Sequence, residues 1–298
     1  MTDYAIVKKR QKASEIESKR SIIRTHLIPW RGPVALDQLG PRDGLDLERS
    51  LADRSRKTFN NVAAVVNSMF RWAVTWGEIR QVPFVLQGVK MTRKEHEFYD
   101  FEEYDLLLGA CPHADPRAEL ILLMGADEGM RMGEMRELRR TDVMIASRRL
   151  TIARRVWKKS DVDVPKGGLV CQLSMTERMA DAFRRNRHLK GDLVLSYPDG
   201  TRLSEETTRS LFRRLCRLAG VPDKGIQALR HTFCSHLAML GRYPIEIQKA
   251  ARHQHIETTM GYMHLSPRRQ ESAIDVLNRR NWREMGDGPR EGAGEIAK

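Results

Sequence analysis

The amino-acid sequence predicts a mainly α-helical protein with a small antiparallel β-sheet, in which a helical N-terminal domain precedes an α+β C-terminal domain. Long segments repeat apolar residues every three or four positions, residues 150–157 and 169–173 have strand-like patterns, the second with period-two alternation, and residues 86–97 are polar and basic with few apolar anchors. These patterns are typical of amphipathic helices, half-buried strands and an interdomain linker. We therefore expect domains at residues 1–95 and 98–285, followed by a glycine-rich, disordered tail at residues 286–298.

The strongest helix of the N-terminal domain is predicted at residues 57–76. Its apolar stripe consists of Phe59, Val62, Val66, Met69, Phe70 and Ala73. Gly77 follows, and glycine commonly ends helices. Weaker helical patterns cover residues 13–27, which stop at Pro29, and residues 45–52, with Gly-Pro steps between them acting as breakers. The N-terminal domain is therefore expected to be a small helical bundle.

The C-terminal domain is predicted to begin with helices at residues 101–110 and from Pro116 onward. Residues 150–157 and 169–173 are predicted to be strands that flank a hairpin turn rich in lysine and glycine. Residues 192–197 are predicted to add a third strand. The domain should therefore combine helices with one small sheet.

One arginine falls on the apolar face of a predicted helix. The apolar positions of this helix are Ile226, Leu229, Phe233, Leu237 and Leu240. Arg230 lies inside that stripe, and because a guanidinium cannot lose its charge, it requires an anion or several acceptors at a buried position. Either a carboxylate inside the fold or a bound ligand can supply the anion. His253 and Tyr262 follow downstream, and such a trio suits a phosphodiester, which needs a charge clamp, a hydrogen-bonding imidazole and a nucleophilic hydroxyl.

The positive charge is spread over both predicted domains. The formal net charge is +13, with 18 Lys and Arg against 11 Asp and Glu in residues 1–98, and 34 against 28 in the remainder. A two-part clamp on a polyanion needs this distribution, because each cation set on a phosphate releases condensed counterions. The alternative is an ordinary solvated basic surface.

Several protein classes are disfavoured by composition. No apolar run approaches the ~20 residues of a membrane span, and the basic N-terminus lacks the apolar segment of a secretory signal, so we expect a cytoplasmic, nucleoid-associated protein. The four cysteines are far apart without a CxxC pair, which favours reduced thiols over a zinc site or disulfides. Five histidines gather near the C-terminus, but we expect no metal site there.

Four short segments together resemble the signatures of the tyrosine recombinases, the phage-integrase family. Residues 228–233 (ALRHTF), 252–253 (RH) and 258–264 (TTMGYMH) closely resemble the C-terminal signature of that family, and residues 129–134 (GMRMGE) resemble its first arginine box. The segments occur in the order of the family, and the resemblance covers most of the chain. It implies a helical core-binding domain followed by a catalytic domain that acts on double-stranded DNA.

The resemblance also implies roles for individual residues. The expected catalytic residues are Arg131, Lys166, Gln227, Arg230, His253 and Tyr262. Tyr262 would attack phosphorus to give a 3′-phosphotyrosyl link, while the two arginines stabilise the non-bridging oxygens, aided by Gln227 and His253. Lys166, on the predicted hairpin, would protonate the leaving 5′-oxygen. No cofactor is expected, since the reaction preserves the phosphodiester free energy and the sequence has no GxxxxGK[ST] loop.

Some assignments stay open on sequence alone. Lys158 and Lys159 are alternatives to Lys166, and Arg131 could instead be a surface arginine paired with Glu134 or Glu128. The sequence also departs twice from the family pattern. Gln227 stands where the family usually has histidine, and Arg252 where it usually has glycine; glutamine cannot shuttle a proton near neutral pH.

The function implied by the resemblance is site-specific DNA recombination by an integrase of a mobile element. Two alternatives are strand relaxation of the topoisomerase IB type, and a non-catalytic or weakly active DNA-binding relic. Recombination would require self-assembly, expected as a tetramer on DNA. Residues 267–282 form an amphipathic pattern that could dock on a neighbouring protomer or pack on its own domain.

Overall fold

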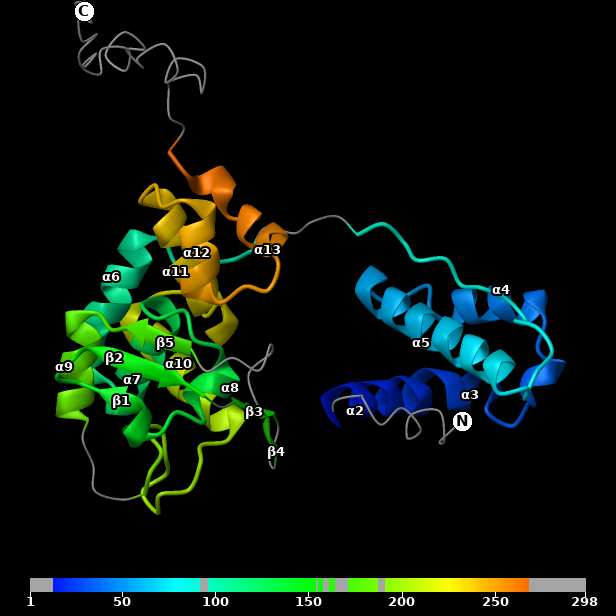
Figure 1. Cartoon of the computed structure of the whole chain (residues 1–298), viewed down its shortest axis with the longest axis horizontal. Helices are drawn as coiled ribbons and strands as arrows, with labels where there is room; N and C mark the ends of the chain where they lie inside the picture. The colour runs from blue at the N-terminus through cyan, green and yellow to red at the C-terminus, as the bar shows by residue number, and fades with distance from the viewer. Residues whose placement is uncertain are drawn as a thin grey trace, which may run out of the picture. The chain divides into compact units, whose positions relative to one another are not determined.

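The computed structural model describes residues 13–91, 96–153, 155–157, 161–163, 171–186 and 191–267. These residues form two compact units, divided between residues 91 and 96 (Figure 1). Helices dominate both units, and the sheet strands are few and antiparallel. The prediction of a mainly α-helical chain with a small antiparallel sheet is therefore confirmed. Among the described residues, no helix combines the length and apolarity that crossing a membrane requires.

The first unit is a helical bundle built on one long helix. Its elements are α2 (Ala13–Ile22), a π-helical turn (Ile23–Leu27), α3 (Ile28–Arg31), a 3-10 turn (Leu36–Gln38), α4 (Pro41–Ser50) and α5 (Arg56–Thr75). The Ser55 hydroxyl caps α5 by accepting from the Thr58 amide at 3.1 Å. The predicted stripe of α5 is buried, with Val62 and Phe70 fully enclosed. A hydrophobic core thus forms along one face of this helix.

Two helix boundaries in this unit differ from prediction because of proline. Helical structure continues past Pro29, which lies in the first turn of α3, and α4 begins at Pro41, earlier than the predicted residue 45. The first turn of a helix tolerates proline because the amide there has no partner within the helix. The Gly40 amide also donates to the Asp43 carboxylate at 2.9 Å, which closes the start of α4.

The second unit contains the remaining helices and all the strands (Figure 1). The helices are α6 (Phe101–Ala110), α7 (Pro116–Ala126), α8 (Met132–Met135), α9 (Glu177–Arg185), α10 (Glu205–Ala219), α11 (Ile226–Met239), α12 (Pro244–Ala251) and α13 (Ile256–Met260), with 3-10 turns at Cys111–His113, Arg140–Asp142 and Met263–Leu265. Helix α7 is buried along almost its whole length and packs against α9, α10 and α11. It is therefore the centre of the core of this unit.

The main sheet has the strand order β1-β2-β5, all antiparallel, with β1 at Val143–Met144, β2 at Arg149–Ile152 and β5 at Cys171–Ser174. Leu150 faces Val143 on one side and Leu173 on the other. The predicted strand at residues 150–157 is interrupted after β2, and its second part is β3 (Arg155–Trp157), which pairs with β4 (Asp161–Asp163).

The third strand predicted at residues 192–197 was wrong. Only isolated bridges form there, Leu193 with Arg139 and Ser196 with Arg202, and β1 takes the edge of the sheet instead. The chain returns on itself directly after Tyr197, whose amide donates to the Thr201 carbonyl at 2.8 Å. A turn this close leaves too few residues for a ladder, which needs several consecutive pairs.

Helices α7 and α11 touch at a glycine. A Cβ added at Gly125 would lie 2.5 Å from the Cβ of Leu229, which is far inside van der Waals contact. We expect Gly125→Ala to lower the free energy of unfolding by about 1–3 kcal/mol, because the helices must separate. Gly109→Ala in α6 is the matched control: no atom lies within 4 Å of its added Cβ, so alanine should stabilise by up to about 1 kcal/mol. Chemical denaturation measures both, and equal stabilisation would contradict this close packing.

Candidate active site

Helix α11 carries Arg230 into the interior of the second unit. Arg230 is 3% exposed, and its guanidinium donates to the carbonyl oxygens of Gly129 and Ala251. Burial, followed by the neighbouring Arg131 and Arg252, lowers the pKa of Arg230 to about 10. Within the described part of the chain, no carboxylate lies within ion-pair distance of this guanidinium. Backbone carbonyls therefore hold Arg230 in place without cancelling its charge.

Arg131, at the start of α8, lies near Arg230. It lies at the N-cap of α8, and its Nη1 pairs with Glu134 Oε1 at 3.0 Å while Nη2 donates to the Arg252 carbonyl at 3.4 Å. Its side chain stays 36% exposed. The structure thus shows the ion pair with Glu134 that the sequence left open, and it also places Arg131 beside Arg230, where one face of the guanidinium remains accessible.

Glu134 is the one carboxylate that contacts these arginines among the described residues. It is buried, accepts from the Arg131 amide at 3.0 Å, and pairs with Arg252 Nη2 at 3.1 Å. Burial alone would raise the pKa of Glu134, but Arg252 and Arg131 outweigh burial and lower it below the ordinary value. The carboxylate is therefore ionised, and it orients two guanidiniums at once.

Arg252 was treated on sequence only as a departure from the family pattern, and the structure adds it to the site. Its backbone is left-handed (φ 57°), which costs about 1 kcal/mol for a residue other than glycine. Its guanidinium donates to the carbonyls of Gly129 at 2.9 Å and Glu128 at 3.4 Å, besides Glu134. These bonds offset the strain. No spacing rule could have revealed them, since they join residues more than 110 positions apart.

His253 and Tyr262 complete the cluster. The His253 Nδ1 lies 2.9 Å from the Thr259 hydroxyl, and its ring is nearly parallel to that of Tyr262, 6.3 Å between centroids. Burial, followed by Arg230, lowers the pKa of His253 to about 4, so the ring is neutral near pH 7. Tyr262 is 3% exposed, and burial raises the pKa of its phenol above the ordinary value, although Arg230 opposes this.

The sequence-predicted residues thus divide into three groups. Arg131, Arg230, His253 and Tyr262 lie together, and they come from α8, α11, the end of α12 and the segment after α13. Gln227 is exposed on the first turn of α11, three residues before Arg230. The three lysine candidates, Lys166, Lys158 and Lys159, lie outside the described residues.

Two further aromatic rings were missed. His231 Nδ1 lies 2.6 Å from the Tyr262 hydroxyl, and His96 stacks on His231 with 4.2 Å between ring centroids. On sequence, His231 was only one of five clustered histidines, and His96 was part of a predicted linker. The adjacency of His231 to Arg230 is the single signal that could have drawn attention to it.

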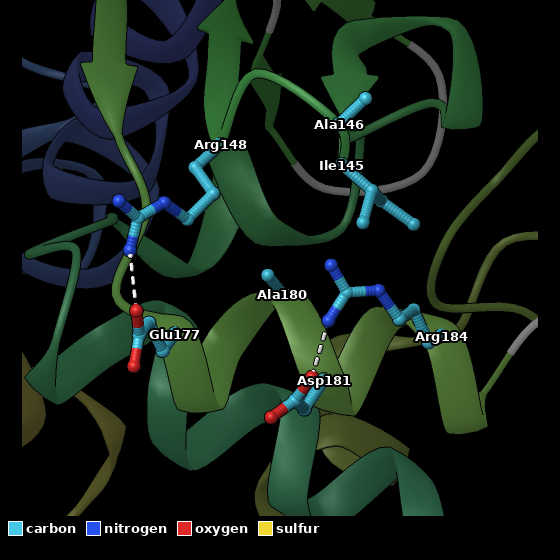
Figure 2. A pocket seen from close by; sticks show the side chains of 7 residues that line it. All are labelled: Ile145, Ala146, Arg148, Glu177, Ala180, Asp181 and Arg184. Atoms are coloured by element: carbon cyan, nitrogen blue, oxygen red, sulfur yellow. Dashed lines mark hydrogen bonds and ion pairs between the residues drawn. The ribbon is translucent and has the colours of Figure 1, made fainter.

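A second polar depression lies apart from this cluster, between the turn after β1 and helix α9 (Figure 2). It is lined by Ile145, Ala146, Arg148, Glu177, Ala180, Asp181 and Arg184. Arg148 pairs with Glu177 across it at 3.0 Å, and Arg184 pairs with Asp181 along α9. Its cations are matched by carboxylates, so it offers no excess charge to an anion. No group of three potential metal-ligating side chains occurs among the residues the structure covers.

The buried Arg230 lies beside Arg131 and Arg252, which share the Glu134 carboxylate, and a tyrosine and a histidine lie next to them. Such a cluster suits an anion such as a phosphodiester, and comparison with known families agrees. The sequence profile of the phage integrase family matches residues 97–269, more than half of the chain, so this chain belongs to the phage integrase family.

Individual relatives are tyrosine recombinases and transposases. Tyrosine recombinase XerC of Staphylococcus carnosus (strain TM300) is 26% identical over 216 residues, which are 71% of this chain and 72% of the relative. Transposase A from transposon Tn554 of Staphylococcus aureus is 23% identical over 260 residues, 74% of this chain and 70% of the relative. The resemblance seen in the four sequence segments is therefore confirmed.

Solved structures share the fold. The Tn1549 transposon integrase, solved in complex with a circular intermediate DNA, matches with a TM-score of 0.73 at 19% identity, covering 93% of this chain and 98% of that chain. A lambda integrase dimer bound to a COC′ core site matches with a TM-score of 0.69 at 14% identity, covering 91% and 96%. At such identities the likeness establishes the fold of the chain, while the chemistry must be argued from its own residues.

Proposed function

We propose that this chain is a site-specific DNA recombinase, an integrase of a mobile element, that cleaves and rejoins DNA strands through a 3′-phosphotyrosyl intermediate on Tyr262. The observation that carries this proposal is the position of Arg230. Its guanidinium is buried next to Arg131 and the Tyr262 phenol, and no described carboxylate neutralises it. A buried, uncompensated cation beside a nucleophilic hydroxyl fits a ligand that carries negative charge on phosphorus.

The proposed chemistry uses the cluster as follows. The two arginines hold the non-bridging oxygens of the scissile phosphate and stabilise the charge that develops on them, with Gln227 and the neutral His253 donating hydrogen bonds. Tyr262 attacks phosphorus, the bond to the 5′-oxygen breaks, and Lys166 supplies the proton to that oxygen. The lysine assignment rests on the family resemblance, with Lys158 and Lys159 as alternatives. Because the phosphotyrosyl bond keeps the free energy of the phosphodiester, rejoining needs no nucleotide.

The proposed partner is double-stranded DNA with a specific recombination site. Both parts of the chain are basic, with an excess of 7 positive charges in residues 1–98 and 6 in the rest, as DNA binding by both would require. The Tn1549 and lambda integrases with this fold were solved on DNA. We propose residues 1–95 as the core-binding domain, residues 98–285 as the catalytic domain, and assembly into a tetramer on DNA.

A covalent trap tests the proposal. Nicked duplex oligonucleotides, tiled across both ends of the DNA segment that carries the gene, are incubated with the full chain and resolved on a denaturing gel. A nick close to the scissile bond lets the short 5′-hydroxyl fragment diffuse away, so the covalent adduct accumulates. We expect an adduct with duplexes from the ends and none with duplexes from the middle of the segment. If no duplex gives an adduct but DNA binding is retained, the recombinase proposal fails and the second candidate function, described next, is favoured.

The second candidate function is a DNA-binding relic without catalysis, and Gln227 favours it. This side chain is exposed on α11 three residues before Arg230, and an amide can donate a hydrogen bond to phosphate but cannot transfer a proton near pH 7. Binding of the nicked duplexes without adduct formation is the result that this candidate requires.

Replacing Gln227 by histidine tests whether the glutamine limits the rate of cleavage. If the glutamine limits the reaction, Gln227→His should speed adduct formation up to about 10²-fold, because an imidazole can both bind phosphate and transfer a proton. The measurement is the single-turnover rate, with DNA affinity determined in parallel. An unchanged or lower rate would mean that the site is adapted to glutamine.

A further inference from the structure

The hydroxyl of Tyr262 has one strong hydrogen-bond partner among the described side chains. It lies 2.6 Å from Nδ1 of His231, which sits one residue after Arg230 on α11. With its hydrogen on Nε2, the neutral imidazole accepts the phenol hydrogen at Nδ1. Burial, followed by His96 and Arg230, lowers the pKa of His231 to about 4, so the ring is neutral near pH 7.

The other groups around the phenol are less suited to take its proton. The Nδ1 of His253 is engaged by Thr259 at 2.9 Å, and its ring lies parallel to Tyr262 with 6.3 Å between centroids. The Cys234 thiol beside Tyr262 is a weak acceptor, and burial raises its pKa to about 11. Gln227 cannot accept a proton near pH 7. Among the described residues around the phenol, His231 is the one with a neutral ring nitrogen in direct contact with the hydroxyl.

The ring of His96 stacks on the ring of His231. The two imidazoles are stacked with 4.2 Å between centroids and 8° between planes, and His96 also lies 5.6 Å from the Tyr262 ring. Stacking sets the tilt of the His231 ring and so the direction of Nδ1 toward the phenol. The charged and titratable groups that act on this pair of residues are His96, Arg230, His253 and Cys234.

We propose that His231 is the catalytic base that takes the Tyr262 proton during strand cleavage and returns it during rejoining, and that His96 is a positioning residue for it. The inference rests on the proposed function. In cleavage, the phenol O–H electron pair forms the bond to phosphorus, the bond from phosphorus to the 5′-oxygen breaks, and the proton moves to Nδ1. Rejoining reverses each transfer: the 5′-oxygen displaces the tyrosine oxygen, which recovers the proton from the imidazolium.

The bound phosphodiester makes this transfer feasible. An imidazolium at this position is unfavourable in the free protein because it is buried and lies beside His96 and Arg230, as the lowered pKa of His231 reflects. A phosphate between the arginines adds the missing negative charge, and the charge of the attacking oxygen passes to phosphorus oxygens that the arginines hold. The proton therefore moves as the new bond forms, and not in advance of DNA binding.

The test compares His231→Asn with the natural chain in single-turnover adduct formation on the nicked duplexes. Asparagine places a polar atom near the position of Nδ1 but cannot take a proton, so we expect a loss of about 10²-fold at pH 7. The rate of the variant should then rise about tenfold per pH unit from pH 7 to 9 as hydroxide replaces the base, while the natural chain changes little. His113→Asn, an exposed histidine in the 3-10 turn at Cys111–His113, is the matched control.

His96→Ala tests whether His96 positions the His231 ring. It should slow adduct formation less than the asparagine variant and leave the shape of the pH profile closer to that of the natural chain. A rate and a pH profile of His231→Asn equal to those of the natural chain would overturn the inference while leaving the proposed function intact. Melting temperature and DNA retention of each variant exclude misfolding as the cause of a lost rate.

A measurement without DNA checks the contact itself. In spectra of protein with ¹⁵N-labelled histidine, Tyr262→Phe should shift the Nδ1 resonance of His231, and Tyr243→Phe, an exposed tyrosine, should not. No shift would overturn the inference directly. If the shift occurs but the natural chain forms no adduct with any duplex, the proposed function fails, and the catalytic role of His231 fails with it.

Discussion

Replacement of Tyr262 by phenylalanine is expected to abolish the covalent protein–DNA adduct, a loss of at least about 10⁴-fold, while DNA affinity stays within about twofold. The substitution removes one oxygen from a ring that is buried and packed against His253. The Thr259 hydroxyl is bonded to His253, and burial raises the pKa of the Cys234 thiol to about 11, so we expect neither group to replace the phenol as nucleophile. Stability should fall by only about 1 kcal/mol, the cost of the lost bond to His231.

The measurement is adduct formation on the nicked duplexes, with DNA retention and thermal melting in parallel. Tyr243→Phe is the matched control, because Tyr243 is 56% exposed at the start of α12. This variant should form the adduct at the rate of the natural chain. A Tyr262→Phe protein that still forms an adduct would assign the nucleophile to another residue. Equal loss in both variants would indicate damage to the fold.

Replacement of Arg230 by lysine is expected to slow cleavage by about 10²–10³-fold although the charge is kept. The guanidinium donates to the carbonyls of Gly129 and Ala251 from separate nitrogens. A guanidinium has five N–H groups, so it can also donate to a phosphate. An ammonium has one nitrogen and cannot reach both carbonyls and a phosphate together. The variant should also lose about 1–3 kcal/mol of stability, because one buried carbonyl remains without a donor.

Single-turnover rates and DNA affinities at several salt concentrations separate these effects. The rate should fall far more than the affinity, since one phosphate contact among many contributes little to binding. Arg148→Lys, in the charge-balanced depression of Figure 2, is the matched control and should cleave normally. A large loss of affinity with a normal rate for the bound protein would place Arg230 in DNA binding alone.

The sequence predicted the parts of the site that depend on local pattern. The apolar stripe of residues 226–240 identified Arg230 as a buried cation, and the structure confirms its burial within α11. The stripe could not say what holds the charge. The answer, two backbone carbonyls from Gly129 and Ala251, depends on how α7, α11 and α12 pack, and no local pattern encodes that.

The features that were missed depend on long-range contacts. His96 and His231 stack although 135 positions separate them in the sequence, and Arg252 bonds to Gly129 and Glu134 from a left-handed backbone that sequence rules assign to glycine. The third strand was wrong for a related reason. The apolar residues at 193–195 are compatible with a strand, but a strand also needs a partner ladder, and β1 occupies that edge of the sheet.

The sharing of one carboxylate by the arginines has a consequence for the protein before it meets DNA. Glu134 balances one unit of charge, whereas Arg131, Arg230 and Arg252 contribute three, so this corner of the fold is assembled against mutual repulsion. The carbonyls of Gly129 and Ala251 hold Arg230 close to the other two cations, which leaves an excess of positive charge. If the proposed function holds, the scissile phosphate acts as the counterion for this excess, and binding of the substrate also relieves the internal repulsion.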